Sequence, residues 1–179
     1  MIIIEGADNS GKSTLAAKFS RVGLPVYPAG PAPKNRQEEI DCLRNQHSLA
    51  RSNFGVMDRV TCISQQIYAD RMFDKVLGAA LMQLMEFDST VLIYCRPPNR
   101  TLMDMSTHKV KAYDTEEHLQ KIIDGQHKYI DRYDSLMSTL PAVVYDWTEP
   151  SINVDEFVKM AIEAQTDSGR WNTLCKLPT

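Results

Sequence analysis

The sequence predicts an α/β fold, in which a doubly wound, five-stranded parallel sheet carries helices on both faces. Short apolar runs alternate with longer segments of helical periodicity, which is the pattern of repeated βαβ units. These runs are continuously apolar, as in strands covered on both sides. With 179 residues and 43% hydrophobic content, the chain is long enough to bury one core, so we expect a single domain over residues 1–179.

Five short runs rich in β-branched or apolar residues are the predicted strands. Polar, Gly or Pro residues follow each run and end the strand. The runs are Met1–Glu5, Pro25–Tyr27, Gly55–Met57, Val91–Tyr94 and Ala142–Tyr145. Ligands of such sheets bind at the carboxyl ends of the strands, so the residues that follow these runs are the first candidates for a site.

Five segments with helical spacing connect or follow these runs. The predicted helices are Ser13–Val22, Arg36–Ala50, Thr61–Glu86, Asp114–Leu140 and Val154–Gln165. In the fourth, apolar residues recur every three or four positions and form one stripe, as expected for a helix packed on a core. Residues 96–113 lack a clear period, and we expect them to form a mobile lid segment beside the site.

Composition and charge exclude several classes of protein. The chain has 20 Lys and Arg against 23 Asp and Glu, which leaves no surplus of positive charge for sequence-independent binding of long nucleic acids. A local basic groove is compatible with this balance. No apolar run approaches the ~18 to 20 residues that cross a bilayer. We expect a cytoplasmic protein, because the sequence opens without a secretory signal and its four cysteines lack disulfide or zinc spacing.

One segment matches a phosphate-binding motif. Gly6-Ala7-Asp8-Asn9-Ser10-Gly11-Lys12-Ser13 fits the pattern G-x-x-x-x-G-K-[ST] between the first predicted strand and the first predicted helix. The glycines let the backbone curl so that its N–H groups face a phosphate, and the helix adds its positive end. We expect the phosphates of ATP to be bound by Gly6, Ala7, Asn9, Ser10, Gly11, Lys12, Ser13 and Thr14.

Side chains of this segment indicate a nucleoside triphosphate with Mg²⁺. Lys12 should reach the β- and γ-phosphates as a point charge, and the Ser13 hydroxyl is placed to bind Mg²⁺. Glu5, directly before the loop, should either hold Mg²⁺-bound water or cap the loop. No N-K-x-D or T-K-x-D motif for binding guanine occurs, which disfavours a GTPase, and the chain is too short for a helicase or AAA-type motor. Among ATP-binding enzymes with this loop, a small kinase is the class that remains.

These motifs together resemble those of thymidylate kinases. Ile3–Thr14 is similar to the E-G-x-D-G-x-G-K-[ST]-T opening of that family, and Asp58-Arg59-Val60 resembles its D-R-Y motif. In motif order the likeness covers the first half of the chain. The family has Gly at the position of Asn9. Its helix motif S-x-x-A-Y-Q would need Ser at position 63, whereas Ser64 and Tyr68 of this sequence stand one position later in the chain.

The resemblance implies a kinase that uses ATP and Mg²⁺ to phosphorylate a deoxynucleoside monophosphate, with a thymidylate-like pyrimidine preferred. A second candidate acceptor is a hydroxymethylated pyrimidine within DNA, which thymidylate-kinase-like relatives in bacterial viruses phosphorylate. A non-catalytic ATP-binding module is an alternative of another class. The expected partner is a nucleotide substrate, and a homodimer is compatible with the sequence.

Three charged residues are the main candidates for metal and acceptor binding. Asp58 ends a buried strand, where a carboxylate needs a partner, so it is a candidate Mg²⁺ ligand or general base. The alternative is that Asp58 caps the next helix through Thr61. Arg59 would grip the acceptor phosphate, or else form a structural ion pair. By resemblance Asp8 would bind the acceptor sugar, and a surface-loop aspartate is the alternative.

Further candidates follow the fourth strand and lie on the third helix. Arg96 and Arg100 flank the rigid Pro97-Pro98 turn and would neutralise the transferring phosphoryl group, unless they are ordinary solvated arginines. Gln65 and Tyr68 would hydrogen-bond to the acceptor base or stack on it, and core packing is the alternative for Tyr68.

Overall fold

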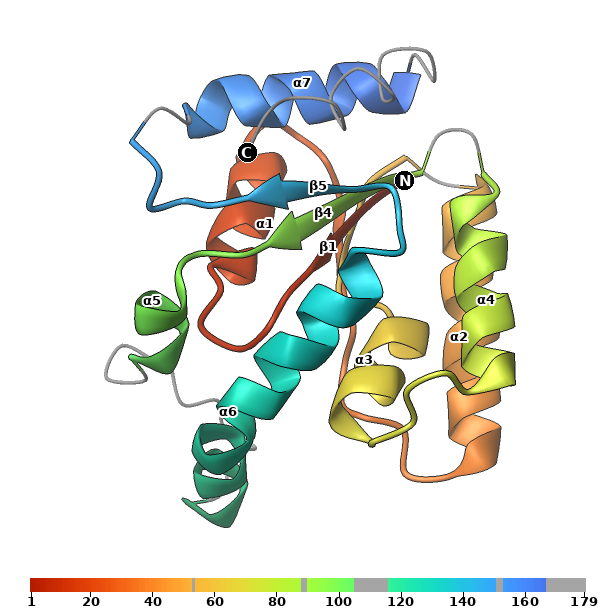
Figure 1. Ribbon diagram of the computed structural model, residues 1–179. Helices are drawn as coiled ribbons and strands as arrows, with labels where there is room; N and C mark the ends of the chain where they lie inside the picture. Colours follow the sequence, from red (N-terminus) through yellow and green to blue (C-terminus); the bar gives the residue numbers. More distant parts are fainter. Residues whose placement is uncertain (53, 88–89, 105–115, 151–152, 167–179) are drawn as a thin grey trace.

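Five parallel strands form one sheet at the centre of the protein (Figure 1). The computed structural model describes residues 1–179 except 53, 88–89, 105–115, 151–152 and 167–179. The strands are β1 Ile2–Glu5, β2 Val26–Pro28, β3 Val56–Asp58, β4 Val91–Cys95 and β5 Ala142–Tyr145. Their order in the sheet is β2-β3-β1-β4-β5. This confirms the predicted fold class and all five predicted strands.

The first strand lies in the middle of the sheet and is paired on both sides. Ile4 lies opposite Asp58 of β3 and Ile93 of β4, and Glu5 lies opposite Tyr94. Ile2, Ile3 and Ile4 are completely buried. A continuously apolar sequence forms this strand because helices cover both of its faces.

Helices cover both faces of the sheet, as the alternating pattern predicts (Figure 1). Leu15 and Phe19 of α1 pack on one face together with Val158 and Ala161 of α7. Residues of α2, α3, α4 and α6 pack on the other face. The helices are α1 Lys12–Arg21, α2 Arg36–Ser52, α3 Thr61–Tyr68, α4 Lys75–Met85, α5 Asn99–Met103, α6 Glu116–Met137 and α7 Val154–Thr166.

The single helix predicted over Thr61–Glu86 is wrong, because the chain breaks into α3 and α4. Asp70 and Phe73 have left-handed backbone conformations, with φ of 57° and 65°, and such residues end an α-helix. Asp74 then starts α4 by accepting hydrogen bonds from the backbone N–H groups of Val76 at 2.9 Å and Leu77 at 3.1 Å. Apolar periodicity continues across the break and therefore conceals it.

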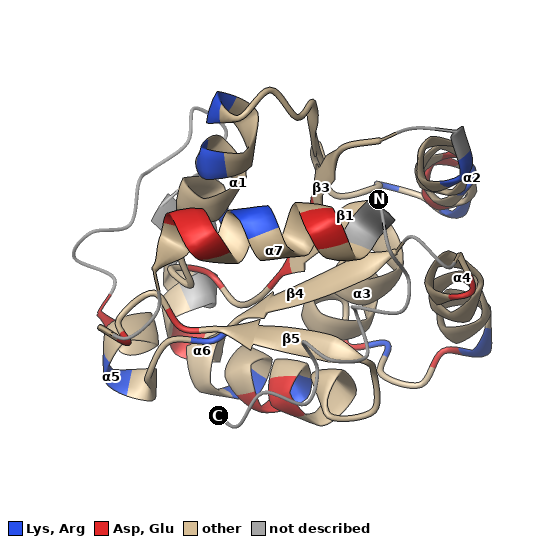
Figure 2. Cartoon of the chain, turned by 90° about the horizontal axis from the view of Figure 1, so that it is seen from above, with Lys and Arg blue, Asp and Glu red and all other residues tan. Residues whose placement is uncertain are grey.

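The predicted lid segment is described only in part. Residues 96–104 contain the short helix α5, which the sequence pattern does not indicate. The remainder of that prediction, 105–113, lies outside the described residues, as does the tail after Thr166. None of the helices in the described part of the chain has the length and apolarity to cross a membrane. In Figure 2, Lys and Arg lie beside Asp and Glu on α6 and α7, so neither helix presents a face of one sign in this view.

Candidate active site

Most of the residues that the sequence singles out lie just beyond the carboxyl ends of β1, β3 and β4. Because these strands are parallel neighbours, their carboxyl ends share one edge of the sheet. The phosphate-binding segment follows β1, Arg59 follows β3 and Arg96 follows β4 (Figure 1). Trp147 follows β5 at the same edge.

The phosphate-binding loop has the tight curvature that its glycines permit. Gly6, Asn9 and Gly11 have φ values of 150°, 62° and 85°. A Cβ atom at Gly6 would lie 2.5 Å from the carbonyl oxygen of Cys95, and one at Gly11 would lie 2.7 Å from the Trp147 ring. These positions therefore require glycine for close packing as well as for backbone conformation. Helix α1 begins directly after Gly11, so its positive end faces the loop.

Lys12 is folded back onto its own loop. Its side-chain nitrogen donates to the carbonyl oxygen of Ala7 at 2.5 Å and to the hydroxyl oxygen of Ser10 at 3.2 Å. Burial lowers the pKa of Lys12 to about 8, and the positive charge of Arg59 acts in the same direction. The negative charges of Asp8 and Asp58 oppose this shift. Lys12 is thus a cation held at the loop by weak acceptors, which a phosphate group could replace.

Arg59 stands in a strained turn at the end of β3 and reaches the phosphate-binding loop. Its backbone has φ of 73°, an uncommon value for a residue with a side chain. Its Nη2 atom donates to Oδ1 of Asp8 at 2.8 Å and to the hydroxyl of Tyr68 at 3.1 Å. The guanidinium carbon lies 5.1 Å from the centre of the Tyr68 ring, within cation–π distance. The structure therefore brings three predicted acceptor-binding residues together.

Asp8 is an ionised group within this cluster and not a surface-loop aspartate. Its side chain is 17% exposed, and its Oδ2 atom accepts a hydrogen bond from the Tyr68 hydroxyl at 3.2 Å. Burial alone would raise the pKa of Asp8, but Arg59 and Lys12 outweigh it and lower the pKa below the ordinary value. Asp8 therefore carries its negative charge at neutral pH, which lets it accept hydrogen bonds from a ligand.

Asp58 and Ser13 supply oxygen atoms of the kind that bind Mg²⁺. The interpretation of Asp58 as a cap of the next helix is wrong, because the Oε1 atom of Gln46 accepts the Thr61 N–H at 2.9 Å. Within the described part of the chain, the Asp58 carboxylate and the Ser13 hydroxyl form no hydrogen bond to the protein. No group of three or more His, Cys, Asp or Glu that could hold a metal occurs there either. This is compatible with Mg²⁺, which usually takes one or two protein ligands and completes its shell with phosphates and water.

Within the described residues, none of the remaining candidates bonds to a side chain of the loop. The Nε and Nη2 atoms of Arg96 donate to the two carboxylate oxygens of Asp134 at 2.7 and 2.9 Å, which ties β4 to α6. Tyr94 donates to the same carboxylate at 2.7 Å. Arg100 is exposed on α5, and Gln65 is half-buried on α3. Their catalytic and base-binding roles stay predictions.

Glu5 connects the end of β1 with the turn after β3 and with α6. Its side chain is completely buried; Oε1 accepts the Val60 N–H at 2.7 Å and Oε2 accepts the Tyr133 hydroxyl at 3.0 Å. Burial raises the pKa of Glu5 to about 7, although the nearby charges of Arg59 and Lys12 oppose the change. Of the two expectations for Glu5, the capping one is nearer to the observed geometry, but the capped N–H is that of Val60, between β3 and α3, and not one of the loop.

Sequence reasoning missed several residues that contact the phosphate-binding loop, Gln126 and Trp147 among them. The Nε2 atom of Gln126, on α6, donates to the carbonyl oxygens of Asp8 at 2.9 Å and Leu102 at 3.2 Å. Trp147 covers Gly11. The position of Trp147 just beyond β5 could have indicated it, since ligands bind at the carboxyl ends of strands. Nothing in the local sequence distinguishes Gln126 from other polar residues of its helix.

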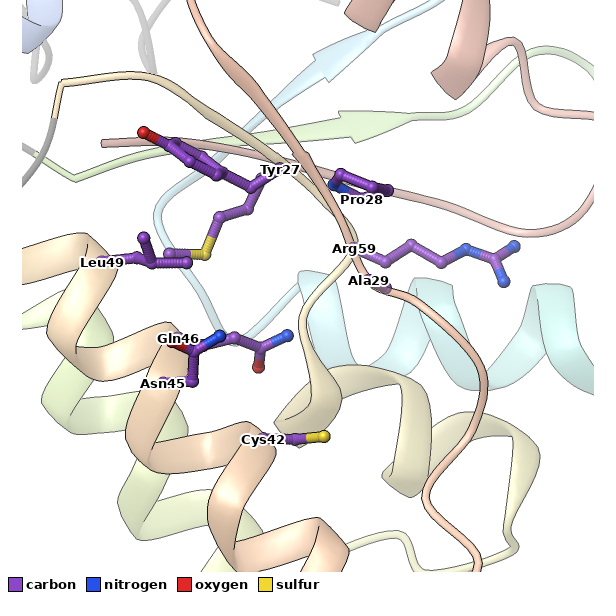
Figure 3. Close-up of a pocket in the computed structure, with 9 residues that line it drawn as sticks. Tyr27, Pro28, Ala29, Cys42, Asn45, Gln46, Leu49 and Arg59 are labelled. Carbon is purple, nitrogen blue, oxygen red and sulfur yellow. The ribbon is translucent and has the colours of Figure 1, made fainter.

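A small pocket lies on the other side of the Arg59 backbone. It has a volume of about 60 Å³ and is lined by residues of α2 and of the ends of β2 and β3. Figure 3 shows the amides of Asn45 and Gln46 near the Cys42 sulfur, while the Arg59 guanidinium points away from them. A pocket of this size holds a few water molecules. Arg59 also lines this pocket, but its guanidinium group points the other way and bonds to Asp8.

Comparison with solved structures identifies proteins of the same fold. The YorR protein from Bacillus subtilis, in complex with phosphorylated GDP, has 20% identity and a TM-score of 0.63 over 92% of this chain and 96% of its own. Deoxyadenosine kinase from M. mycoides with bound dATP has 17% identity and a TM-score of 0.58, over 93% of this chain and 99% of its own. The same kinase with dCMP and a flexible dCDP has 16% identity and a TM-score of 0.53, over 92% of this chain and 97% of its own. No protein-family model and no curated protein matches the sequence. The likeness shows that the chain shares the fold of these proteins.

Glu5 should make the stability of the protein depend on pH. Its pKa is raised from 4.5 to about 7, so between these values the folded state binds more protons than the unfolded state. The contribution of Glu5 to the free energy of unfolding therefore falls as pH rises through this interval. Glu5→Gln keeps both hydrogen-bond partners and cannot ionise. Relative to this variant, the wild-type protein should lose roughly 3 kcal/mol across the interval, at about 1.4 kcal/mol per pKa unit.

Urea unfolding of both proteins at about pH 4.5, 6 and 7.5 measures this difference. Other titrating groups, Asp8 among them, are present in both proteins and cancel in the comparison. Parallel dependences of the two unfolding free energies on pH would contradict the prediction.

Proposed function

We propose that this protein transfers the γ-phosphoryl group of ATP to a deoxynucleoside monophosphate. The observation that carries the proposal is the contact between Arg59 and Asp8. One residue follows β3, the other belongs to the phosphate-binding loop, and their side chains meet 2.8 Å apart beside that loop. A cation and an anion at this place can bind the two ends of a nucleotide acceptor, its phosphate and its sugar hydroxyl.

The loop forms the donor side of the proposed site. Its backbone N–H groups and the positive end of α1 would surround the phosphates of ATP. On binding, Lys12 would exchange the Ala7 carbonyl and the Ser10 hydroxyl for oxygens of the β- and γ-phosphates. Ser13 and Asp58 would hold Mg²⁺, which neutralises the charge that develops on the phosphate oxygens during transfer.

The acceptor side uses the donors and acceptors that the Arg59–Asp8 pair leaves free. A guanidinium group has five N–H donors, and within the described residues only those on Nη2 bond to other side chains. The others can donate to an acceptor phosphate. Asp8 can accept a sugar hydroxyl, because each carboxylate oxygen has two lone-pair sites. Tyr68 holds both groups and keeps them oriented before the acceptor arrives.

The class of acceptor is inferred from the sequence and from proteins of the same fold. The E-G-x-D and D-R motifs resemble those of thymidylate kinases, which favours a pyrimidine monophosphate. The deoxyadenosine kinase of like fold was solved with deoxynucleotides, dATP in one case and dCMP with dCDP in another. Two alternatives make different predictions about turnover: phosphorylation of a modified pyrimidine within DNA, and ATP binding without transfer.

A panel of acceptors tests the proposal directly. The purified protein is incubated with ATP, Mg²⁺ and either nucleosides, deoxynucleoside monophosphates or DNA oligomers with and without hydroxymethylated pyrimidines. We expect transfer to a pyrimidine deoxynucleoside monophosphate to be fastest and to depend little on salt, because few phosphate contacts are involved. Transfer to modified DNA alone, falling steeply as salt rises, would establish the DNA alternative, and ATP binding with no transfer would establish the non-catalytic one.

Replacing the loop lysine should abolish most of the activity. Lys12→Ala removes the charge that stabilises the transferring phosphates, so turnover should fall at least ~100-fold while the protein remains folded. Lys18→Ala, on the same helix, removes a cation that pairs with Asp155 at 3.2 Å instead and should leave turnover unchanged. Circular dichroism confirms folding of both variants. Near-normal transfer by folded Lys12→Ala would refute the donor side of the proposal.

Replacing Arg59 should affect the acceptor and spare ATP. Arg59→Ala should lower kcat/KM for the acceptor by roughly 30- to 150-fold, which corresponds to the ~2 to 3 kcal/mol of a charge-assisted hydrogen bond. ATP affinity, followed by the fluorescence of Trp147 beside Gly11, should change little. The control is Arg44→Ala on α2, whose side chain is 76% exposed. An equal loss of ATP affinity in Arg59→Ala would place Arg59 on the donor side.

A further inference from the structure

Glu5 is a buried carboxylate that takes no direct part in the proposed reaction. It ends β1, and both of its oxygens have a partner, the Val60 N–H at 2.7 Å and the Tyr133 hydroxyl at 3.0 Å. A buried carboxylate is costly unless hydrogen bonds and opposite charges compensate it. Two partners and two nearby cations, Arg59 and Lys12, offset part of this cost. Its place is therefore closely determined.

The bond to Val60 holds the backbone on one side of Arg59, and β1 also holds the other side. The Arg59 N–H donates to the carbonyl oxygen of Ile4 at 3.0 Å, and the next N–H, that of Val60, donates to Glu5. Between these two bonds Arg59 has a φ of 73°. Residues other than glycine rarely adopt this conformation and keep it only where their surroundings hold it.

The direction of the Arg59 side chain depends on this turn. In the observed conformation the guanidinium group reaches Asp8 at 2.8 Å and Tyr68 at 3.1 Å, and in Figure 3 it points away from the pocket beside α2. A return of φ to ordinary negative values would swing the Cα–Cβ bond away from this direction. The guanidinium group would then leave the phosphate-binding loop.

We propose that Glu5 is a positioning residue for acceptor binding: its hydrogen bond to Val60 maintains the left-handed turn that aims Arg59 at the acceptor phosphate. The proposal rests on the proposed function, in which Arg59 binds that phosphate. Tyr133 supports it from α6, because it bonds to the other carboxylate oxygen and its ring stacks on Tyr94 at 5.9 Å between ring centres.

Two substitutions separate the hydrogen bond of Glu5 from its charge. Gln at position 5 can still accept the Val60 N–H and can donate to the Tyr133 oxygen, whereas Ala can do neither. Glu5→Ala should lower kcat/KM for the acceptor about 10-fold or more, and Glu5→Gln should stay within about 3-fold of wild type. Both variants should keep ATP affinity within about 2-fold, measured by Trp147 fluorescence.

A double variant tests whether Glu5 acts through Arg59. If it does, Glu5→Ala should cause no further loss of acceptor turnover in a protein that already carries Arg59→Ala. A double variant in which the losses of acceptor turnover of the two single variants multiply would overturn the proposal. So would a Glu5→Gln variant as impaired as Glu5→Ala, since the charge would then be the essential feature, or an equal loss of ATP affinity in Glu5→Ala.

The Val60 amide resonance in a ¹H–¹⁵N spectrum tests the anchor without any acceptor. Its hydrogen-bonded proton shift should persist in Glu5→Gln and be lost in Glu5→Ala, and a shift unchanged in Glu5→Ala would overturn the proposal. If Glu5→Ala does not fold, Glu5→Asp replaces it, because its shorter side chain keeps the charge and cannot reach Val60. A wild-type protein that phosphorylates no acceptor refutes the proposed function. The Val60 proton shift then still shows whether Glu5 holds the Val60 backbone.

Discussion

Four charged side chains share the buried space where β1 and β3 end, and the rest of the site depends on the balance between them. Glu5 and Asp8 are negative when ionised, and Lys12 and Arg59 are positive; Glu5 is 0% and Lys12 7% exposed. Charges withdrawn from water are stable only when each has a partner of opposite sign or a hydrogen bond. Asp8 is therefore paired with Arg59, and Lys12 is held by oxygens of its own loop. A polyanionic ligand would enter this cluster by exchange of existing partners.

Much of the fold follows from local sequence patterns. Continuous apolar runs locate the five strands, and the loop motif lies between β1 and α1 as predicted. The break between α3 and α4 is not visible in this way, because it depends on the left-handed conformations of Asp70 and Phe73. Periodicity indicates which side of a segment faces the core, and both helices pack into the same core cluster. The short helix α5 escapes notice because five residues are too few to establish a period.

The site is predicted to the extent that its residues follow strands or belong to a motif. Asp8, Lys12 and Arg59 satisfy this condition, although sequence alone does not show that Arg59 bonds to Asp8. The bonds from Gln126 to Asp8 and from Tyr133 to Glu5 join positions more than a hundred residues apart, so no local pattern encodes them. At Asn9 the structure explains a departure from the thymidylate kinase motif, which has Gly at this position. The Asn9 amide nitrogen bonds to the carbonyl oxygens of Thr101 and Asp104 at 2.9 and 2.6 Å, which links the loop to the end of α5.

The central position of β1 also determines when the protein can fold during its synthesis. β1 leaves the ribosome before its neighbours in the sheet, β3 and β4, which end at Asp58 and Cys95. Until β4 emerges, the apolar segment Ile2–Ile4 has an unpaired edge, and such nascent strands are prone to aggregation. The phosphate-binding loop, which follows β1, can take its final shape only then, because Gly6 packs against the Cys95 carbonyl. The growing chain thus carries the loop motif well before the strands that shape it.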